Sequence, residues 1–138
     1  MPDSLREQVV EAFSQRISAS RSNQLSSEDP LPARVLWDTD ETAERLAYGK
    51  LRMTLTVGVG VMDRVPRDVT SSKKGNGMLA QLLEDALNQD PTMGGLTESI
   101  NYSDSTMDYP EPGQDVMAVL ASFEIVYQTD SISPYTNS

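Results

Sequence analysis

The segment from Lys50 to Met62 constrains the fold most strongly, because apolar side chains occupy every second position in it. Side chains of a β-strand alternate between its two faces, so this period of two predicts a long strand with one buried face. The apolar positions are Leu51, Met53, Leu55, Val57, Val59 and Val61. The other face carries mainly threonine, glycine and basic residues, so we expect only one side of this strand to be covered by a core.

Two segments have the spacing of amphipathic helices that pack on such a strand. Ser4 and Glu7 form an S-x-x-E capping box, in which each side chain satisfies a backbone N–H at the helix start. With the apolar residues that follow every four positions, the box predicts a helix over about residues 4–18. Leucine and alanine recur in the same way further along the chain and predict a second helix from residue 76 or 78 to 89, before Pro91.

Three shorter segments complete the predicted sheet. Residues 33–37, 97–106 and 116–128 have apolar side chains at alternate positions and are expected to be strands. The element order then predicts an α+β domain, in which two helices pack on one face of a mainly antiparallel four-stranded sheet as a two-layer sandwich. We expect one domain over residues 1–128 and a flexible tail over 129–138.

Three connections are predicted between these elements. Residues 18–32 are polar and end in two prolines, which indicates an irregular connection, and residues 107–115 are expected to be an acidic hairpin loop. Asp38 to Glu44 contains four carboxylates within seven residues, which raises the possibility of a metal site. The stretch lacks the glycine and final glutamate of a calcium loop, so a solvated acidic loop is the favoured interpretation.

A fourth connection is basic. Residues 63–77 form a segment that we predict to be a long mobile loop, and its cations are Arg64, Arg67, Lys73 and Lys74. Loops of this length without internal structure are often functional or disordered. Two interpretations stay open, which are a solvated charged loop and an arm that reaches a neighbouring subunit or an acidic partner.

Trp37, Gly58 and Gly60 are candidate contact residues. The single tryptophan is expected to be an anchor at the sheet edge or at an interface, because indole buries much apolar area. Gly58 and Gly60 do not begin a phosphate loop, since no G-x-G-x-x-G followed by a helix is present. Glycines on one strand face typically mark a bend, a bulge or a place where another group lies flat on the sheet. In an oligomer such a flat patch is a docking surface.

The residue inventory excludes several kinds of site. The chain of 138 residues has no cysteine and no histidine, which excludes thiol nucleophiles, Ser-His-Asp triads and zinc sites built on these residues. An acid–base enzyme would have to use Asp, Glu, Lys or Tyr, and no spacing indicates such a pair. We therefore expect no enzyme and no cofactor. No apolar run spans a bilayer and the start lacks a signal-peptide pattern, so a soluble cytoplasmic product is expected.

The charge of the chain is divided unevenly. The net charge is −10, all 11 Lys and Arg lie in residues 1–74, and residues 75–138 carry only acidic charges. Binding to nucleic-acid phosphates requires a clustered basic surface, which the second half cannot provide. The excess acid serves solubility, or it faces a basic partner, the first half of a neighbouring copy, or a lumen to which DNA must not adhere.

In its order of elements and several local patterns, the chain resembles the tail terminator and tail completion proteins of tailed bacteriophages, the group that includes minor tail protein U. The resemblance covers about residues 4–128. It rests on the N-terminal helix, the short strand ending in Trp37-Asp38, the strand over 50–62, the second helix, the Gly94-Gly95-Leu96 turn, Tyr102, and the closing segment Phe123-Glu124-Ile125-Val126-Tyr127.

The resemblance implies a structural virion protein of the phage neck, assembled in the bacterial cytoplasm. Such proteins form hexameric rings that cap the tail tube, and their partners are the tail tube protein and the head-completion or connector protein. DNA would pass through the ring without specific binding. The connections 18–32 and 63–77 are long for the family, so a head–tail connector or tail tube protein stays an alternative. A soluble module that binds a ligand or peptide on its open sheet face is another.

Overall fold

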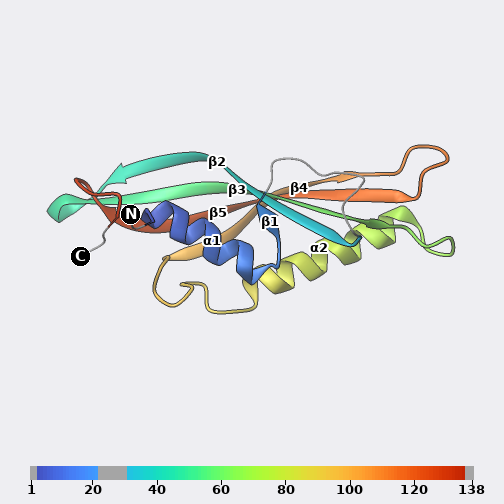
Figure 1. Ribbon diagram of the computed structural model, residues 1–138, viewed down its shortest axis with the longest axis horizontal. Helices are drawn as coiled ribbons and strands as arrows, with labels where there is room; N and C mark the ends of the chain where they lie inside the picture. The colour runs from blue at the N-terminus through green and yellow to red at the C-terminus, as the bar shows by residue number, and fades with distance from the viewer. Residues whose placement is uncertain (1–2, 22–30, 136–138) are drawn as a thin grey trace.

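The predicted long strand forms the centre of the fold and is two residues longer than expected. This strand, β3 (Lys50–Arg64), lies between β2 (Ala33–Arg45) and β5 (Val116–Asp130) and is antiparallel to both. The structure is a computed structural model, and it describes residues 3–21 and 31–135 (Figure 1). The pairing of β3 with β5 is continuous from Lys50 opposite Asp130 to Arg64 opposite Val116.

The sheet has five strands rather than four. Its order is β1-β2-β3-β5-β4, where β4 (Ser99–Asp108) is antiparallel to β5 and β1 (Ser20–Arg21) is parallel to β2. The α+β class and the mainly antiparallel sheet are therefore confirmed, and the strand number is corrected. β1 is only two residues long, so no period in the sequence marks it. The rest of the predicted connection, residues 22–30, lies outside the described residues.

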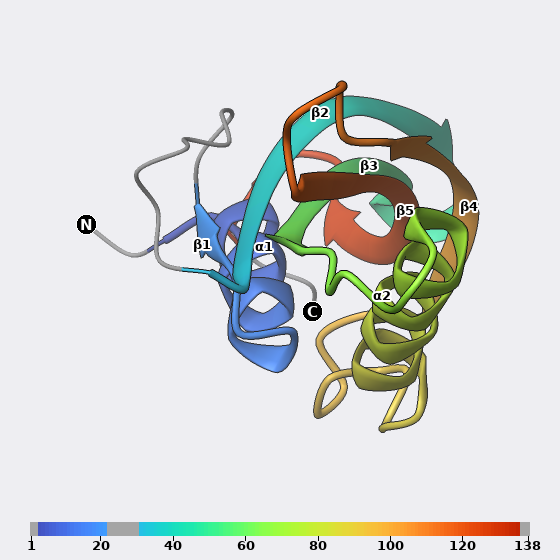
Figure 2. The same cartoon turned by 90° about the vertical axis from the view of Figure 1, so that its right-hand side faces the viewer.

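Two helices lie on the same side of this sheet. They are α1 (Leu5–Arg16) and α2 (Ser71–Leu87), and the curved sheet arches over both (Figures 1 and 2). The Ser4 hydroxyl accepts a hydrogen bond from the Glu7 backbone N–H at 3.1 Å, which confirms the predicted N-cap. Neither these helices nor any other described helix is long and apolar enough to cross a membrane.

The core fills the space between the helices and the inner face of the sheet. The ring of Phe13 on α1 meets the ring of Phe123 on β5 edge-on, with centroids 5.3 Å apart. Both side chains are fully buried, so replacing either by alanine is expected to cost about 3–5 kcal/mol. The largest other side chains in this layer are Ile17, Leu36, Leu55, Leu82, Met117 and Ile125.

The predicted acidic loop over residues 38–44 is instead part of β2, which extends to Arg45. A register shift between Asp38 and Glu41 interrupts the pairing with β3, and pairing then resumes from Glu41 opposite Leu55. The prediction failed because the inner face of this half-strand carries a carboxylate where a core strand has an apolar residue. Asp38 and Glu41, opposite the buried residues Val57 and Leu55, both lie on the inner face because the register shift interrupts the alternation of side chains.

The predicted mobile loop over residues 63–77 is also wrong, because α2 begins at Ser71. Thr70 caps the helix by accepting a hydrogen bond from the Lys73 N–H at 3.2 Å. Gly75 and Gly77 therefore lie inside the helix, although each glycine costs about 1 kcal/mol there relative to alanine. Gly75 has a packing reason, since an added Cβ would lie 2.7 Å from the sulfur of Met107. Only residues 65–70 connect strand and helix.

The chain end is more ordered than predicted. Thr129 and Asp130 complete β5, and the Leu5 N–H donates to the Pro134 carbonyl at 2.9 Å, which ties the end of the chain to α1. Two residues of the expected tail are thus part of the sheet, and residues 136–138 lie outside the described part. The hairpin loop between β4 and β5 is confirmed as a connection, although it begins at Tyr109 because β4 continues to Asp108.

A carboxylate organises the turn that follows α2. The Asp90 side chain accepts hydrogen bonds from the Thr92 hydroxyl at 2.7 Å, the Thr92 N–H at 2.9 Å and the Gly94 N–H at 3.0 Å. These bonds stabilise the charged form, led by the bond from the Thr92 hydroxyl, and lower the pKa of Asp90 to about 2. The turn that contains Gly94, Gly95 and Leu96 is therefore fixed by the acid that precedes it.

Candidate interaction surfaces

Trp37 and Gly58 are brought together within one chain. They are paired residues of β2 and β3, and a Cβ on Gly58 would lie 2.5 Å from Cε2 and Nε1 of Trp37. The indole therefore lies flat on the glycine, on the sheet face opposite the helices. A flat contact on a glycine was predicted, but its occupant comes from the same chain. Gly60 is buried as well, so the accessible group of this predicted patch is half-buried Trp37.

The outer face of the sheet is mixed in character and carries no helix. On β5 it presents Leu120, which is 38% exposed, and half-buried Val126 among serine, glutamate and glutamine side chains. Arg52 Nε donates to Glu98 Oε2 across this face at 2.9 Å, and that hydrogen bond is the main reason that the pKa of Glu98 is lowered. An uncovered face of this composition resembles the surface of a non-obligate protein interface more than a core.

The uneven division of charge is partly compensated inside the molecule. Four ion pairs join a cation of the first half to an acid of the second half, because β3 pairs with β5 and the start of β2 lies near α2. They are Arg34–Asp85, Lys50–Asp130, Arg52–Glu98 and Arg64–Asp115, at 2.8 to 3.1 Å. Four exposed acids that form no ion pair within the described residues lie on the β4 side, namely Asp104, Asp108, Glu111 and Glu124, and others, such as Asp40, Glu84 and Asp90, lie elsewhere.

The four predicted basic residues do not form one arm. Arg64 ends β3 and pairs with Asp115, and Lys74 on α2 pairs with Asp63 at 2.8 Å. Arg67 in the connection and Lys73 in the first turn of α2 are exposed, and neither forms an ion pair within residues 3–21 and 31–135. The free positive charge at this end of the molecule is therefore carried by two residues rather than four.

A network of polar groups joins α1 to the C-terminal half of β2. Arg6 on α1 donates to Asp38 at 2.7 Å and lies 3.5 Å from Glu41, and Glu41 accepts a hydrogen bond from the Tyr127 hydroxyl at 2.6 Å. The hydrogen bond from Arg6 is the main reason that the pKa of Asp38 is lowered, whereas burial first and Glu41 second raise the pKa of Tyr127. The network explains how an acidic half-strand is held against the core, and each of its groups has a structural role.

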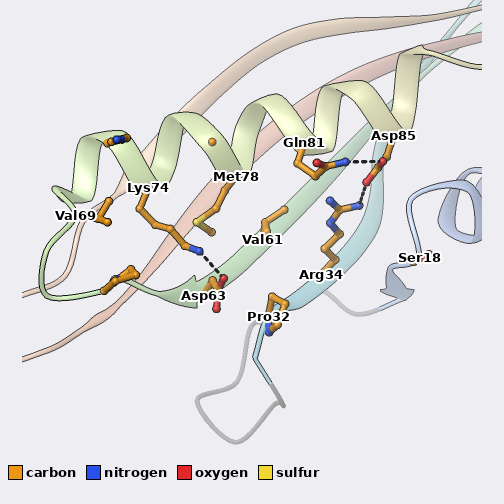
Figure 3. A pocket seen from close by; sticks show the side chains of 13 residues that line it. Ser18, Pro32, Arg34, Val61, Asp63, Val69, Lys74, Met78, Gln81 and Asp85 are labelled. Atoms are coloured by element: carbon orange, nitrogen blue, oxygen red, sulfur yellow. Dashed lines mark hydrogen bonds and ion pairs between the residues drawn. The ribbon is translucent and has the colours of Figure 1, made fainter.

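A pocket of about 730 Å³ lies between α2, the start of β2, the end of β3 and Ser18, two residues after α1 (Figure 3). Its walls include the apolar side chains of Val61, Pro66, Val69 and Met78. Arg34 extends along one side and donates to both the Ile17 carbonyl and the Asp85 carboxylate at 2.8 Å. This pocket, called the socket below, was not predicted, because its lining comes from segments more than 60 residues apart.

The β2–β3 turn carries an exposed aromatic residue. Tyr48 is 100% exposed and has a φ of +65°, a left-handed conformation that costs roughly 1–2 kcal/mol for a residue with a Cβ. The neighbouring Gly49 carbonyl accepts from the Ser131 N–H at 2.7 Å, which brings Ile132, 94% exposed, to the same end of the molecule. The turn with Tyr48 is called the hairpin tip below. No pattern in the sequence marks it.

Neither kind of sequence comparison assigns the chain to a family. No protein-family model matches it, and no curated protein sequence is significantly similar to it. The acidic stretch considered as a metal site is split between the two faces of β2. Within the described residues no three carboxylates are placed to hold a metal ion. The surfaces themselves therefore carry the functional argument.

Proposed function

We propose that the chain is a structural subunit of the phage neck, a tail terminator that forms a ring on the end of the tail tube. The observation that carries this proposal is the uncovered outer face of a sheet whose central strands are 15 residues long. A monomer of this size has little reason to leave Leu120, Val126 and Trp37 on one uncovered face. Contacts with the tail tube or with other neck proteins would cover part of that face.

The remaining charge supports the same proposal. The exposed acids of β4, β5 and their connection give that side of the molecule a negative surface without a nearby free cation among the described residues. A negative surface repels DNA phosphates, as the bore of a ring through which DNA passes must do. The proposed partners are the tail tube protein on one side of the ring and the head-completion or connector protein on the other.

The test is the mass of the protein in solution and on tail tubes. Sedimentation at increasing protein concentration should give a closed oligomer, with a hexamer as the expected species, and the protein should co-sediment with purified tail tubes. A tail tube protein would instead give polymers of unlimited length, because its head-to-tail contacts continue along an axis. A protein that stays monomeric at high concentration and does not bind tubes contradicts the proposal and favours a ligand-binding module.

A further inference from the structure

The hairpin tip presents an aromatic side chain that the rest of the chain does not cover. Tyr48 and Gly49 both have positive φ, the backbone conformation that type I′ hairpin turns require. The Tyr48 ring is fully exposed, so it makes no packing contact with its own domain. An aromatic ring held away from its own domain on a tight turn is suited to insertion into another surface, because Tyr loses little conformational entropy on binding.

The socket has the chemistry that such a ring requires. Pockets of roughly 300–1,000 Å³ with apolar walls and a few polar groups typically bind compact, mainly apolar groups. The walls of the socket are apolar at Val61, Val69 and Met78, and its polar groups are held in place by the Arg34–Asp85 and Lys74–Asp63 pairs (Figure 3). A phenol ring would lie against the apolar walls, and its hydroxyl would meet a paired carboxylate or guanidinium.

The hairpin tip and the socket lie at opposite ends of β3. The tip precedes Lys50, whereas the socket includes Val61 and Asp63, so the two are separated by about 35 Å along the strand (Figure 1). A rigid sheet cannot bring its own tip to its own socket. Two copies of the chain can make this contact, and since its two sides differ, it repeats from copy to copy and closes a ring or extends.

Charges around the two surfaces are complementary. The tip carries exposed Glu44 and Arg45, and Glu44 has only a loose contact with Arg52 at 3.7 Å. The socket rim carries exposed Lys73, which is unpaired among the described residues, and Asp68 lies in the segment that contributes two socket residues. Glu44 and Arg45 therefore each have an oppositely charged residue at the rim, Lys73 and Asp68 respectively. This arrangement favours one orientation of the second copy relative to the first.

We propose that the socket binds Tyr48 of a second copy of this chain, and that this head-to-tail contact joins neighbouring subunits. The inference rests on the proposed ring-forming function and names the contact that would build the ring. Ile132 lies beside the tip and would pack on the rim. The contact leaves the outer sheet face and β4 available for the tail tube and the connector.

Disulfide trapping tests the pairing directly, because the natural chain has no cysteine. A Tyr48→Cys chain is mixed with a Gln81→Cys chain, since Gln81 lines the socket and is exposed. Mild oxidation should give a mixed disulfide at several times the yield of the matched control, Tyr109→Cys with Gln81→Cys. Tyr109 is 49% exposed and follows β4 at the end of the sheet opposite Tyr48. Equal yields from the two mixtures contradict the proposal.

Blocking variants test the contact without a crosslink. Gly77 lines the socket and an added Cβ there meets nothing within 4 Å, so Gly77→Phe fills the socket and Gly77→Ala is the matched control. Tyr48→Gly removes the ring and suits the positive φ. Gly77→Phe and Tyr48→Gly should each raise the dissociation constant of the oligomer at least tenfold, and Gly77→Ala should not.

The outcomes separate the two proposals. An oligomer that forms with unchanged affinity in both Gly77→Phe and Tyr48→Gly overturns the tip-and-socket contact and leaves the ring proposal standing. A wild-type protein that remains monomeric and does not bind tail tubes overturns both. Because both substitutions relieve or spare the backbone, melting temperatures at low concentration that do not fall below the wild-type value are expected and show that the variants are folded.

Discussion

Adding a methyl group at Gly58 tests whether the Trp37 indole is packed on the sheet as the structure shows. Its added Cβ would lie 2.5 Å from two atoms of the Trp37 indole, whereas carbon atoms in contact are about 3.5–4.0 Å apart. Gly58 is in the middle of β3, paired with Trp37 on one side and Ser122 on the other, so its backbone cannot recede. The rigid indole would have to move by about an ångström or more.

The magnitude follows from two opposing effects. Forcing extra volume into a packed site costs roughly 1–3 kcal/mol, and replacing glycine by alanine in a strand returns about 0.5–1 kcal/mol of backbone entropy. The difference between these ranges is centred near ~1 kcal/mol, so we expect Gly58→Ala to lower the free energy of unfolding by about 1 kcal/mol. With an unfolding entropy of ~2.1 cal/mol/K per residue over 138 residues, the melting temperature should fall by roughly 3 °C.

The assay uses the single tryptophan. Thermal and urea unfolding followed by Trp37 fluorescence give the stability, and a shift of the native emission to longer wavelength reports the displaced indole. Gly77→Ala is the control, because its methyl meets nothing and should stabilise α2 by about 0.5–1 kcal/mol.

A double-mutant cycle shows whether the indole is the cause. In a Trp37→Ala background, followed by circular dichroism, Gly58→Ala should become neutral or stabilising. If Gly58→Ala stabilises the wild-type protein as Gly77→Ala does, the reasoning about the indole is refuted.

Three further predictions address the network, the free cations and the response to acid. Tyr127→Phe removes a hydrogen bond to the Glu41 carboxylate and should lower the free energy of unfolding by about 1–3 kcal/mol in urea titrations; an unchanged midpoint would show that water replaces the hydroxyl. The double variant Arg67→Glu/Lys73→Glu should weaken self-association in sedimentation experiments. Its melting temperature should stay the same, because neither side chain packs in the core. Association as strong as that of the wild type would show that the two cations make no contact between subunits. The pKa of Asp90 is lower in the folded state than in the unfolded state, so the stability that it contributes is fully present above pH ~4 and is lost as pH falls toward 2. Asp90→Asn should therefore flatten the curve of unfolding free energy against pH in this range. An equally steep curve in the variant would contradict the role of Asp90.

The parts of the fold that the sequence predicts are those in which burial follows a simple period. In β3 and β5 every second residue faces the helices, and in α1 the apolar stripe from Val9 to Ile17 is buried without exception at its four-residue spacing. Burial is what the pattern records, so the α+β class and the layer order were recoverable from it. The additional strand β1 was not predicted, since its two residues are too few to show a period.

Elsewhere the deciding interactions join distant segments. In the second half of β2, Glu41 lies on the face toward the helices. This position is stable because Arg6 of α1 and Tyr127 of β5 contact its carboxylate. The first turns of α2 contain two glycines and resemble a loop, yet Gly75 leaves room for Met107. Local propensity opposed the structure in both places, and tertiary contacts prevailed.

The candidate surfaces also depend on contacts between distant segments, and these the sequence did not predict. Trp37 and Gly58 were predicted separately as contact residues, and the structure pairs them with each other, which leaves the outer side of the indole as the accessible surface. The socket and the hairpin tip were missed because the first is assembled from separate elements and the second is one residue in a short turn. Exposure combined with backbone strain at Tyr48 is a signal that only coordinates provide.

The acidic second half constrains how copies of the chain can meet. β4 is an outer strand of the described sheet, and such an edge is a template for adding further strands. Asp104 and Asp108 on this strand are exposed, and antiparallel pairing of two β4 edges would bring like charges close together, which is destabilising. Sheet extension is therefore disfavoured, whereas the hairpin tip and the socket lie at ends that carry both signs of charge. Self-association through the ends avoids this repulsion, and it closes into a ring when the rotation between neighbouring copies allows closure.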